Sequence, residues 1–435
     1  MRILIFILFA PLGLIAQSEI DSISFPKVEV AVAAAEGKVV FAGGRQTFSN
    51  DIPFDTLLRQ NRVVDIFDTQ KGEWTQDTLQ YAKDDAKAVA LGSDIYIAGD
   101  ASSPPNGELR FVEVYNVNTG EWKALTLPTL EEVDVITEEN GWIFFAHGNK
   151  VDLFNPVDST WESFQLSEGP ERNDLGIASC EGKVFFAGGG SPDQGLFNKI
   201  DVYDIASGTL DSLSLGLART RVACECLNGK VYFIGGNFDF FSYTDLIEVY
   251  DIGENTWDSL FMDENKIGFA TAVLGTKLYV AGGIDEREDP SSTIEVYDTE
   301  TGEKEFLQLS VARSEFNGIA YEGRIFFAGG NLGGIGPYTH RVDVLGEPFE
   351  PTSTYRNLSE NLVYYPNPVS RSLKVEVYKH NEFPLSYEIF SLAGKKMYEG
   401  TLKTPFQEIH LENLQKGIYL LKFEGIKGIG KLVKQ

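Results

Sequence analysis

The sequence predicts an all-β protein in which a repeated four-stranded sheet precedes a second, smaller β domain. Short runs of Val, Ile, Phe and Tyr alternate with turn residues, and the 435-residue chain holds 12% aromatic residues and 43 glycines. This composition favours strands over helices. A chain of this length buries a large core without needing disulfide crosslinks.

An apolar strand that ends in a glycine pair recurs along the chain. Intact pairs end at Gly44, Gly189, Gly236, Gly283 and Gly330. Two copies are degenerate, with Asp100 in place of the second glycine and His147 in place of the first. The last three intervals between intact pairs are each 47 residues long. So constant a period predicts one structural unit per repeat, seven in all.

Each repeat contains four strand-like runs. The first is rich in small residues, the second ends in the glycine pair, the third resembles residues 247–251, and the fourth opens with Trp in four copies. Tight turns such as Asn228-Gly229-Lys230 and Thr119-Gly120-Glu121 separate the runs. These are hairpin signals, so each unit is expected to be an antiparallel meander.

The repeats are expected to stack face to face and to close radially. One small sheet cannot bury both of its faces, so neighbouring copies must cover each other, with Tyr and Trp side chains between them. The glycine pair ends a crowded inner strand and therefore indicates a bulge or a close backbone approach.

The pattern of Gly235, Gly236, Tyr250 and Trp257 resembles the kelch repeat, and the resemblance covers residues 19–345. Kelch repeats imply a β-propeller, here with seven blades. The seventh copy stops at Leu345 without a fourth strand, whereas residues 20–25 match the fourth-strand segment 210–215. The N-terminal segment is therefore expected to pair with residues 342–345 and to remove the open edges.

The N-terminus has the features of a signal peptide over residues 1–16. Met1-Arg2 precedes an apolar run from Ile3 to Ile15, and the small residue Ala16 follows. The run is short for a bilayer span and no later apolar stretch is long enough, so a transmembrane anchor is not expected. The net charge of −27 disfavours nucleic acid as a partner.

A linker over residues 346–360 is expected to lead to a second domain over residues 361–435. This tail carries 11 Lys and Arg against 7 Glu, a net charge of +4, which leaves −31 for the rest of the chain. Alternating runs such as Leu373–Val377 predict a small β-sandwich.

Three segments of the tail resemble the type A sorting domain of the type IX secretion system. They are Tyr365-Pro366-Asn367-Pro368, residues 390–394 and residues 414–420. The resemblance implies that the secretion machinery is a partner and that the protein crosses the outer membrane. It also implies that the tail is usually removed and that the body is released or tethered at the cell surface. An ordinary accessory sandwich is the alternative.

The loops between the second and third strands are long and unlike one another, so ligand binding is expected on their face of the ring. One of these loops carries Phe238, Phe240, Phe241 and Tyr243. Exposed, these rings would stack on sugars or anchor a protein; alternatively, they cover the loop's own small core. The acidic loop 285–289 suggests calcium but lacks a recognised ligand spacing, so no cofactor is predicted.

Charged residues also recur just before the first strand of the repeats. Two positions are predicted to ring the channel mouth and to bind a polar or anionic ligand, unless their members pair with one another. Counted back from the turn glycine, the first position lies ten residues away and comprises Lys27, Arg172, Arg219 and Arg313. The second lies eight residues away and comprises Glu29, Asp84, Asp174, Arg221 and Glu315.

The three cysteines do not form a disulfide framework. Cys224 and Cys226 lie two apart on one strand, at the edge of the distance that a bridge tolerates. The sequence therefore favours buried free thiols, and a bridge involving Cys180 is the alternative.

The chain has few of the residues that known catalytic centres on this fold use. Kelch-like propellers include copper oxidases and sialic-acid mutarotases, but the body holds only His147 and His340, too few imidazoles for such a copper site. No P-loop, HExxH or GxSxG motif occurs. The leading hypothesis is a secreted or surface-attached binding module for protein or glycan. The alternative is a carbohydrate-active enzyme in which an Arg meets a carboxylate, such as Arg219 or Arg221 near Asp174.

Overall fold

The computed structural model divides the chain into two compact units, Met1–Glu347 and Pro348–Gln435. It describes residues 17–45, 62–99, 111–130, 132–167, 169–239, 242–333, 337–346, 362–365, 369, 371–377, 383–391, 394–425 and 430–434. The described parts of both units consist of strands and their connections, without a helix. They therefore contain no helix long and apolar enough to span a membrane.

The first unit contains, in its described residues, seven four-stranded antiparallel sheets, as the repeat predicts. The first three blades follow the chain in order. They are β2 (Ala31–Ala35), β3 (Lys38–Ala42), β4 (Val63–Asp68) and β5 (Glu73–Thr78); β6 (Lys87–Leu91), β7 (Asp94–Ala98), β8 (Phe111–Asn116) and β9 (Trp122–Thr126); and β10 (Val135–Glu139), β11 (Trp142–His147), β12 (Lys150–Asn155) and β13 (Thr160–Gln165).

Blades four and five each carry an additional two-stranded hairpin between their second and third strands. Blade four contains β14 (Gly176–Cys180), β15 (Lys183–Ala187), β18 (Lys199–Asp204) and β19 (Thr209–Ser214), with the hairpin β16 (Gly190–Ser191) and β17 (Gly195–Leu196). Blade five contains β20 (Ala223–Leu227), β21 (Lys230–Ile234), β24 (Leu246–Asp251) and β25 (Thr256–Phe261), with the hairpin β22 (Asn237–Asp239) and β23 (Ser242–Tyr243).

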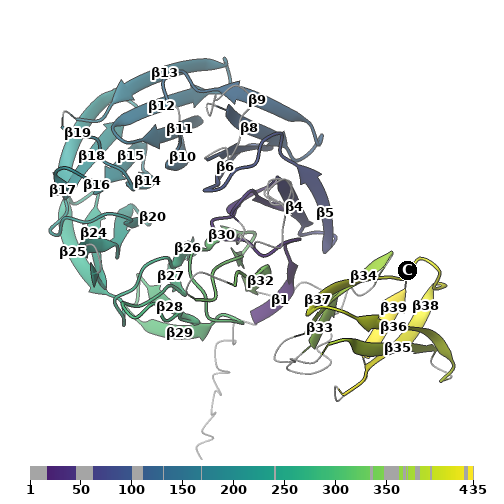
Figure 1. Ribbon diagram of the computed structural model, residues 1–435. Helices are drawn as coiled ribbons and strands as arrows, with labels where there is room; N and C mark the ends of the chain where they lie inside the picture. The colour runs from purple at the N-terminus through teal and green to yellow at the C-terminus, as the bar shows by residue number, and fades with distance from the viewer. Residues whose placement is uncertain are drawn as a thin grey trace, which may run out of the picture. The chain divides into compact units, whose positions relative to one another are not determined.

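The last two blades complete the ring. Blade six contains β26 (Ala270–Leu274), β27 (Lys277–Ala281), β28 (Thr293–Asp298) and β29 (Lys304–Gln308). Blade seven contains β30 (Asn317–Tyr321), β31 (Arg324–Ala328), β32 (Arg341–Leu345) and the N-terminal β1 (Gln17–Ser22). Each innermost strand contacts the innermost strand of the next blade, and β2 contacts β30, so the sheets form the closed ring of Figure 1.

The N-terminal strand completes blade seven with a register two residues away from the expected one. Gln17 lies opposite Leu345 and Ser22 lies opposite Arg341. The N–H of Ile23 donates to His340 O at 2.9 Å, as that of Leu215 donates to Asn198 O at 2.7 Å in blade four. Ile23, and not Phe25, therefore takes the place of Leu215. The pairing leaves no open seam between the first and last repeats.

The glycine pair allows neighbouring blades to approach closely. A Cβ at Gly188 would lie 2.3 Å from the carbonyl oxygen of Arg219 in the next blade, and Gly189 donates its N–H to that oxygen at 3.0 Å. The φ of Gly188 is 66° and that of Gly189 is 95°, which disfavours residues with a side chain. The close backbone approach predicted from the sequence is confirmed.

The second unit is the expected β-sandwich. One sheet contains β33 (Leu362–Tyr365), β34 (Ser372–Val377) and β37 (Phe406–His410). The other contains β35 (Leu385–Ser391), β36 (Lys396–Leu402), β38 (Gly417–Phe423) and β39 (Gly430–Lys434). Buried side chains from both sheets, including Val375, Ile389 and Leu421, form its core.

Candidate ligand-binding site

The cations predicted at the channel mouth lie inside the protein. Lys27, Arg172, Arg219 and Arg313 are at most 3% exposed. Arg219 Nη1 lies 2.5 Å from Glu248 Oε2, and Arg313 Nη1 lies 2.6 Å from Asp343 Oδ2. Arg172 pairs with Asp201 in the same way. The prediction that these four side chains ring the mouth and meet a ligand is wrong, because each bonds to its own blade.

Lys27 occupies the same position with weaker bonding. Its Nζ lies 3.3 Å from Val63 O, and the carboxylate of Asp65 is nearby. Burial lowers the pKa of Lys27 to about 8, although the negative charge of Asp65 opposes the shift.

A carboxylate on the third strand joins neighbouring blades in all seven repeats. Each one accepts a backbone N–H from the segment that connects the preceding blade to its own blade; Gly216 donates to Glu248, for example, at 2.5 Å. Four of these carboxylates also pair with a buried cation of their own blade, Arg172, Arg219, Lys266 or Arg313, and we call each such pair an interblade ion pair. All seven carboxylates are buried. They are Asp65, Glu113, Asp152, Asp201, Glu248, Glu295 and Asp343.

Sequence reasoning missed two cations of this set, Lys83 and Lys266. Lys266 Nζ lies 2.7 Å from Glu295 Oε1, and Lys83 Nζ donates to Phe111 O at 2.9 Å. Gly92 and Gly275 hold the first position of their two-residue turns, whereas Gly37 holds the second. Type I′ and type II′ turns place glycine at different positions of the turn. Counting back from the glycine therefore places the predicted cation one residue away from its true position in these two blades. Counting from the turn itself finds both lysines.

The second predicted set lies at the start of the inner strands, and its role as a ligand site at the channel mouth stays a prediction. Glu29, Asp174, Arg221 and Glu315 each lie two residues before an inner strand, with φ between 53° and 55°. Their backbones bond across blades: Arg221 N donates to Asp174 O at 3.0 Å, and Glu29 N donates to Glu315 O at 3.0 Å. Asp85, not Asp84, lies two residues before the inner strand of blade two.

We call these charged groups, together with the partners named next, the rim. Among the described residues, the rim contains more carboxylates than permanent cations. The carboxylates are paired in part. Arg45 lies 3.3 Å from Glu29, Arg221 lies 3.7 Å from Asp174, Lys87 bonds to Asp85, and His147 Nδ1 lies 2.9 Å from Asp134. The hydrogen bond to Asp134 raises the pKa of His147, although burial opposes it.

A cavity of about 210 Å³ lies directly below the rim. Most of its lining residues lie at the start of the inner strands and have small apolar side chains, but polar atoms supply more of the exposed lining than apolar atoms do. The lining residues are Ala31, Val32, Ala86, Lys87, Ala88, Val135, Ile136, Ile177, Asn317 and Gly318. The channel therefore has a charged rim beside a small chamber of mixed polarity.

The described aromatic residues of the blade-five loop are accessible to different degrees. Phe238 is 42% exposed in β22, whereas Tyr243 in β23 is half-buried. Phe240 and Phe241 lie outside the described residues. In the acidic loop, Arg287 and two backbone N–H groups bond to the carboxylate of Asp285. The described part of the chain contains no group of three or more side chains arranged for a metal ion.

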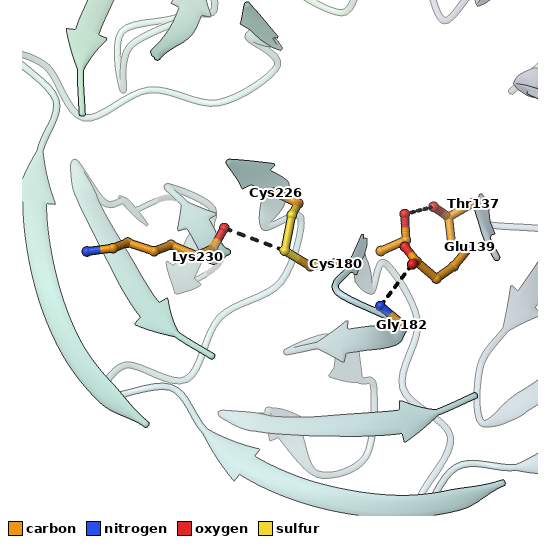
Figure 2. The surroundings of a disulfide bond; sticks show 7 residues. Thr137, Glu139, Cys180, Gly182, Cys226 and Lys230 are labelled. Atoms are coloured by element: carbon orange, nitrogen blue, oxygen red, sulfur yellow. Dashed lines mark hydrogen bonds between the residues drawn. A yellow bond between two sulfur atoms is a disulfide. The ribbon is translucent and has the colours of Figure 1, made fainter. Parts of the chain in front are cut away.

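Two of the three cysteines form a disulfide, contrary to the expectation of free thiols. Cys180 on β14 bonds to Cys226 on β20, with their Cα atoms 5.5 Å apart (Figure 2). The bond joins the inner strands of neighbouring blades, a proximity that only the closed ring creates. Cys224 remains a free thiol, and burial raises its pKa.

Comparisons with known proteins agree with this architecture. The kelch motif matches residues 218–260 and 267–303, and the secretion system C-terminal sorting domain matches residues 363–435. An F-box/kelch-repeat protein from Arabidopsis thaliana is 28% identical over 130 residues, which cover 27% of this chain and 32% of the relative. The chain therefore matches only about a third of that relative's length.

Fold and motifs together define what this chain contains: kelch motifs within a ring of four-stranded antiparallel sheets. It also carries a C-terminal sorting domain for type IX secretion. Both resemblances predicted from the sequence are confirmed.

Proposed function

We propose that the protein is an exported binding module whose propeller meets a protein or glycan on its loop-bearing face. The observation that carries this proposal is the contrast between the two ends of the blades. At one end, two-residue turns join the first and second strands. At the other end, the connections differ from blade to blade, from a two-residue turn in blade three to the hairpin of blade four and the Asp285–Asp289 loop of blade six. Binding surfaces gather on such variable loops.

The sorting domain supports secretion to the cell surface or exterior, where a binding module of this kind meets extracellular ligands. A signal peptide over residues 1–16, which lie outside the described residues, completes the proposed route. On this route the leader directs passage across the inner membrane, and the tail engages the type IX machinery. Whether the body is then released or tethered depends on tail processing.

The carbohydrate-active enzyme remains the second candidate because Arg221 approaches Asp174 at the rim. Their side chains are 61% and 56% exposed, however, and neither residue lines the chamber. Catalysis on a sugar requires converging polar groups in a pocket that excludes water. The accessible position of this pair therefore favours binding over turnover.

A glycan array and a pull-down from surface extracts, both with the full chain, test the proposal. Binding that Phe238→Ala or a rim substitution weakens is the expected result. Turnover of a sugar substrate together with no stable ligand would reject it in favour of the enzyme.

A further inference from the structure

Blade three differs from the other blades at the junction that precedes it. Six blades have a lysine or arginine four residues before the inner strand, namely Lys27, Lys83, Arg172, Arg219, Lys266 and Arg313. The sequence of blade three has Glu131 there, which lies outside the described residues. The carboxylate of Asp152 accepts hydrogen bonds from Thr129 N at 3.0 Å and from the hydroxyls of Thr129 and Ser163 at 2.6 Å. Backbone and hydroxyl donors therefore satisfy it.

Blade three carries a titratable cation at another place. His147 ends β11, where the intact repeats have the first glycine of the pair. Its Nδ1 lies 2.9 Å from Asp134 Oδ1, and its Nε2 lies 3.8 Å from Glu132 Oε2. Both acids belong to the connection between blade two and blade three. The imidazole is 26% exposed, so it is partly shielded from solvent.

A third carboxylate reaches the same histidine from the connection to blade four. Glu171 lies against the backbone of Gly148, since a Cβ at Gly148 would lie 2.5 Å from Glu171 Oε1. Asn149 completes the two-residue turn after His147 and donates its side-chain N–H to Pro170 O at 2.8 Å. His147 therefore lies between two interblade connections that present three carboxylates to it.

The neighbouring lysine and arginine have other surroundings. Arg172 follows Glu171 in the chain, but it is buried and pairs with Asp201. Lys150 lies opposite His147 in the ladder of β11 and β12, and its side chain is exposed. The charge of the imidazole is therefore the one that balances these three carboxylates.

The two protonation states of His147 bond differently. An imidazolium carries an N–H on both nitrogens, whereas a neutral imidazole carries only one. The hydrogen bond to Asp134 keeps that proton on Nδ1, so Nε2 of the neutral ring becomes an acceptor facing the carboxylate of Glu132. Loss of the proton therefore turns the attraction to Glu132 into repulsion and removes the attraction to Glu171, while the bond to Asp134 remains.

We propose that His147 is a pH-dependent clasp between the two interblade connections that flank blade three. As an imidazolium it holds Glu132 and Glu171. As a neutral imidazole it bonds to Asp134 and releases both glutamates. The clasp acts on the loop-bearing face and requires no ligand, so it does not depend on the proposed binding function.

The surroundings of His147 set the pH range of the clasp. The hydrogen bond to Asp134 and the charges of Asp134, Glu132 and Glu171 raise the pKa of His147 above its usual 6.5, against the effect of burial. A histidine whose pKa is raised in the folded state stabilises that state fully below the usual pKa. The clasp is therefore closed below pH 6.5 and opens as the pH rises through the raised pKa.

Hydrogen exchange of the full chain at pH 6 and pH 9, corrected for intrinsic exchange rates, tests the clasp. Peptides that cover residues 127–135 and 166–175 should lose protection at pH 9 by roughly two- to fivefold, the size expected for a partly exposed ion pair. His147→Arg, which stays charged at both pH values, should abolish this loss. His147→Gln should show the low protection at both pH values.

Glu132→Gln tests the same contact with the histidine in place, and it decides if the His147 variants misfold. The loss of protection should shrink, and the pKa of His147, followed by NMR, should fall. The chain has four histidines, and His147→Gln identifies the signal. Glu121→Gln, in the tight turn at the other end of blade two, is the matched control and should change neither quantity.

Three results overturn the inference. One is equal protection of both segments at pH 6 and pH 9 in the natural chain. Another is a pKa of His147 at or below 6.5, or one that Glu132→Gln leaves unchanged. The third is a loss of protection spread evenly over all blades, which would show general destabilisation instead of a local clasp.

Discussion

At the residue scale, the buried carboxylate on the third strand of each blade bonds to the connection from the preceding blade, and in blades four to seven it also pairs with a cation. Glu248, for example, accepts hydrogen bonds from the guanidinium of Arg219 and from the backbone N–H of Gly216. Gly216 lies just before the inner strand of the same blade. Removing one member of such a buried pair leaves an uncompensated charge. These groups therefore stabilise the junctions between blades.

Replacing Arg219 with Met is expected to lower the free energy of unfolding by about 3–5 kcal/mol, because Glu248 then lies buried without its cation. Urea unfolding measures this loss. Arg221→Met, two residues away on the exposed rim, is the matched control and should change stability by less than about 0.5 kcal/mol. Equal losses in both variants would contradict the assignment of Arg219 to the interior.

The interblade ion pairs should also make the propeller sensitive to acid. Burial by itself would raise the pKa of Glu295, but Lys266, Lys304 and Tyr297 together lower it from 4.5 to about 2. The ionised form is thus favoured in the folded state. Its contribution is fully present above pH 4.5 and is lost as the pH falls from 4.5 towards 2.

Glu295→Gln isolates this contribution. The difference in thermal midpoint between the natural chain and the variant should be largest near pH 6 and should shrink steadily below pH 4.5. Acidic groups elsewhere titrate in both proteins and cancel in the difference. A difference that stays constant down to pH 3 would show that Glu295 is not held ionised by its neighbours.

At the scale of strands, the sequence predicts the elements more accurately than their partners. The third strand predicted over residues 247–251 begins one residue earlier, at Leu246. The closing strand was expected at residues 20–25 and lies at Gln17–Ser22. The offset arises because similarity between Ile20–Phe25 and Leu210–Leu215 aligns side-chain types, whereas hydrogen bonds to β32 set the register.

The disulfide between β14 and β20 should contribute measurably to stability. Cys180 and Cys226 are 46 residues apart, and closing a loop of that length in the unfolded chain corresponds to about 4 kcal/mol in the chain-entropy description. The free energy of unfolding of the double variant Cys180→Ser, Cys226→Ser should be lower by that amount. Urea unfolding measures the loss. Cys224→Ser is the control, since its thiol is free.

Mass spectrometry of the unreduced chain checks the pairing independently. A peptide that joins Cys180 to Cys226 is expected, with Cys224 open to alkylation after unfolding. A bridge between Cys224 and Cys226 would contradict the observed arrangement.

At the scale of the whole molecule, two units carry charges of opposite sign and have different proposed roles, export and binding. The tail carries +4 and the remainder −31, and the tail alone matches the sorting domain. Deleting residues 363–435 is expected to leave the propeller folded but retained in the periplasm. Immunoblots of periplasm, surface and medium measure this. A reporter protein fused to a leader and to residues 361–435 should, conversely, leave the cell.

Secretion of the truncated chain at an unchanged rate would contradict the proposed role of the tail. Binding on the loop face should persist in the truncated chain, because the rim and its chamber belong entirely to the first unit. The two proposals, export and binding, can thus fail separately.

The architecture of this protein can be predicted from its sequence alone. The 47-residue period, the four strands per repeat and the closure by the N-terminal strand are visible there, as is the sorting domain at the end. These features are local patterns of strand, turn and glycine, repeated often enough to be recognised. The sequence also placed Asp174, Arg221 and Glu315 just before the inner strands, because their position two residues before a strand is itself local.

Which side chains contact one another follows from the packing of strands and blades. The tertiary structure buries Arg172, Arg219 and Arg313 against Asp201, Glu248 and Asp343, and it joins Cys180 to Cys226. These partners lie about 30 or 46 residues apart in the chain. Their contact depends on the register between strands and on how one blade packs against the next. A pattern of residue types predicts that blades stack. It does not give the distance between two particular side chains, because that distance follows from the geometry of the closed ring.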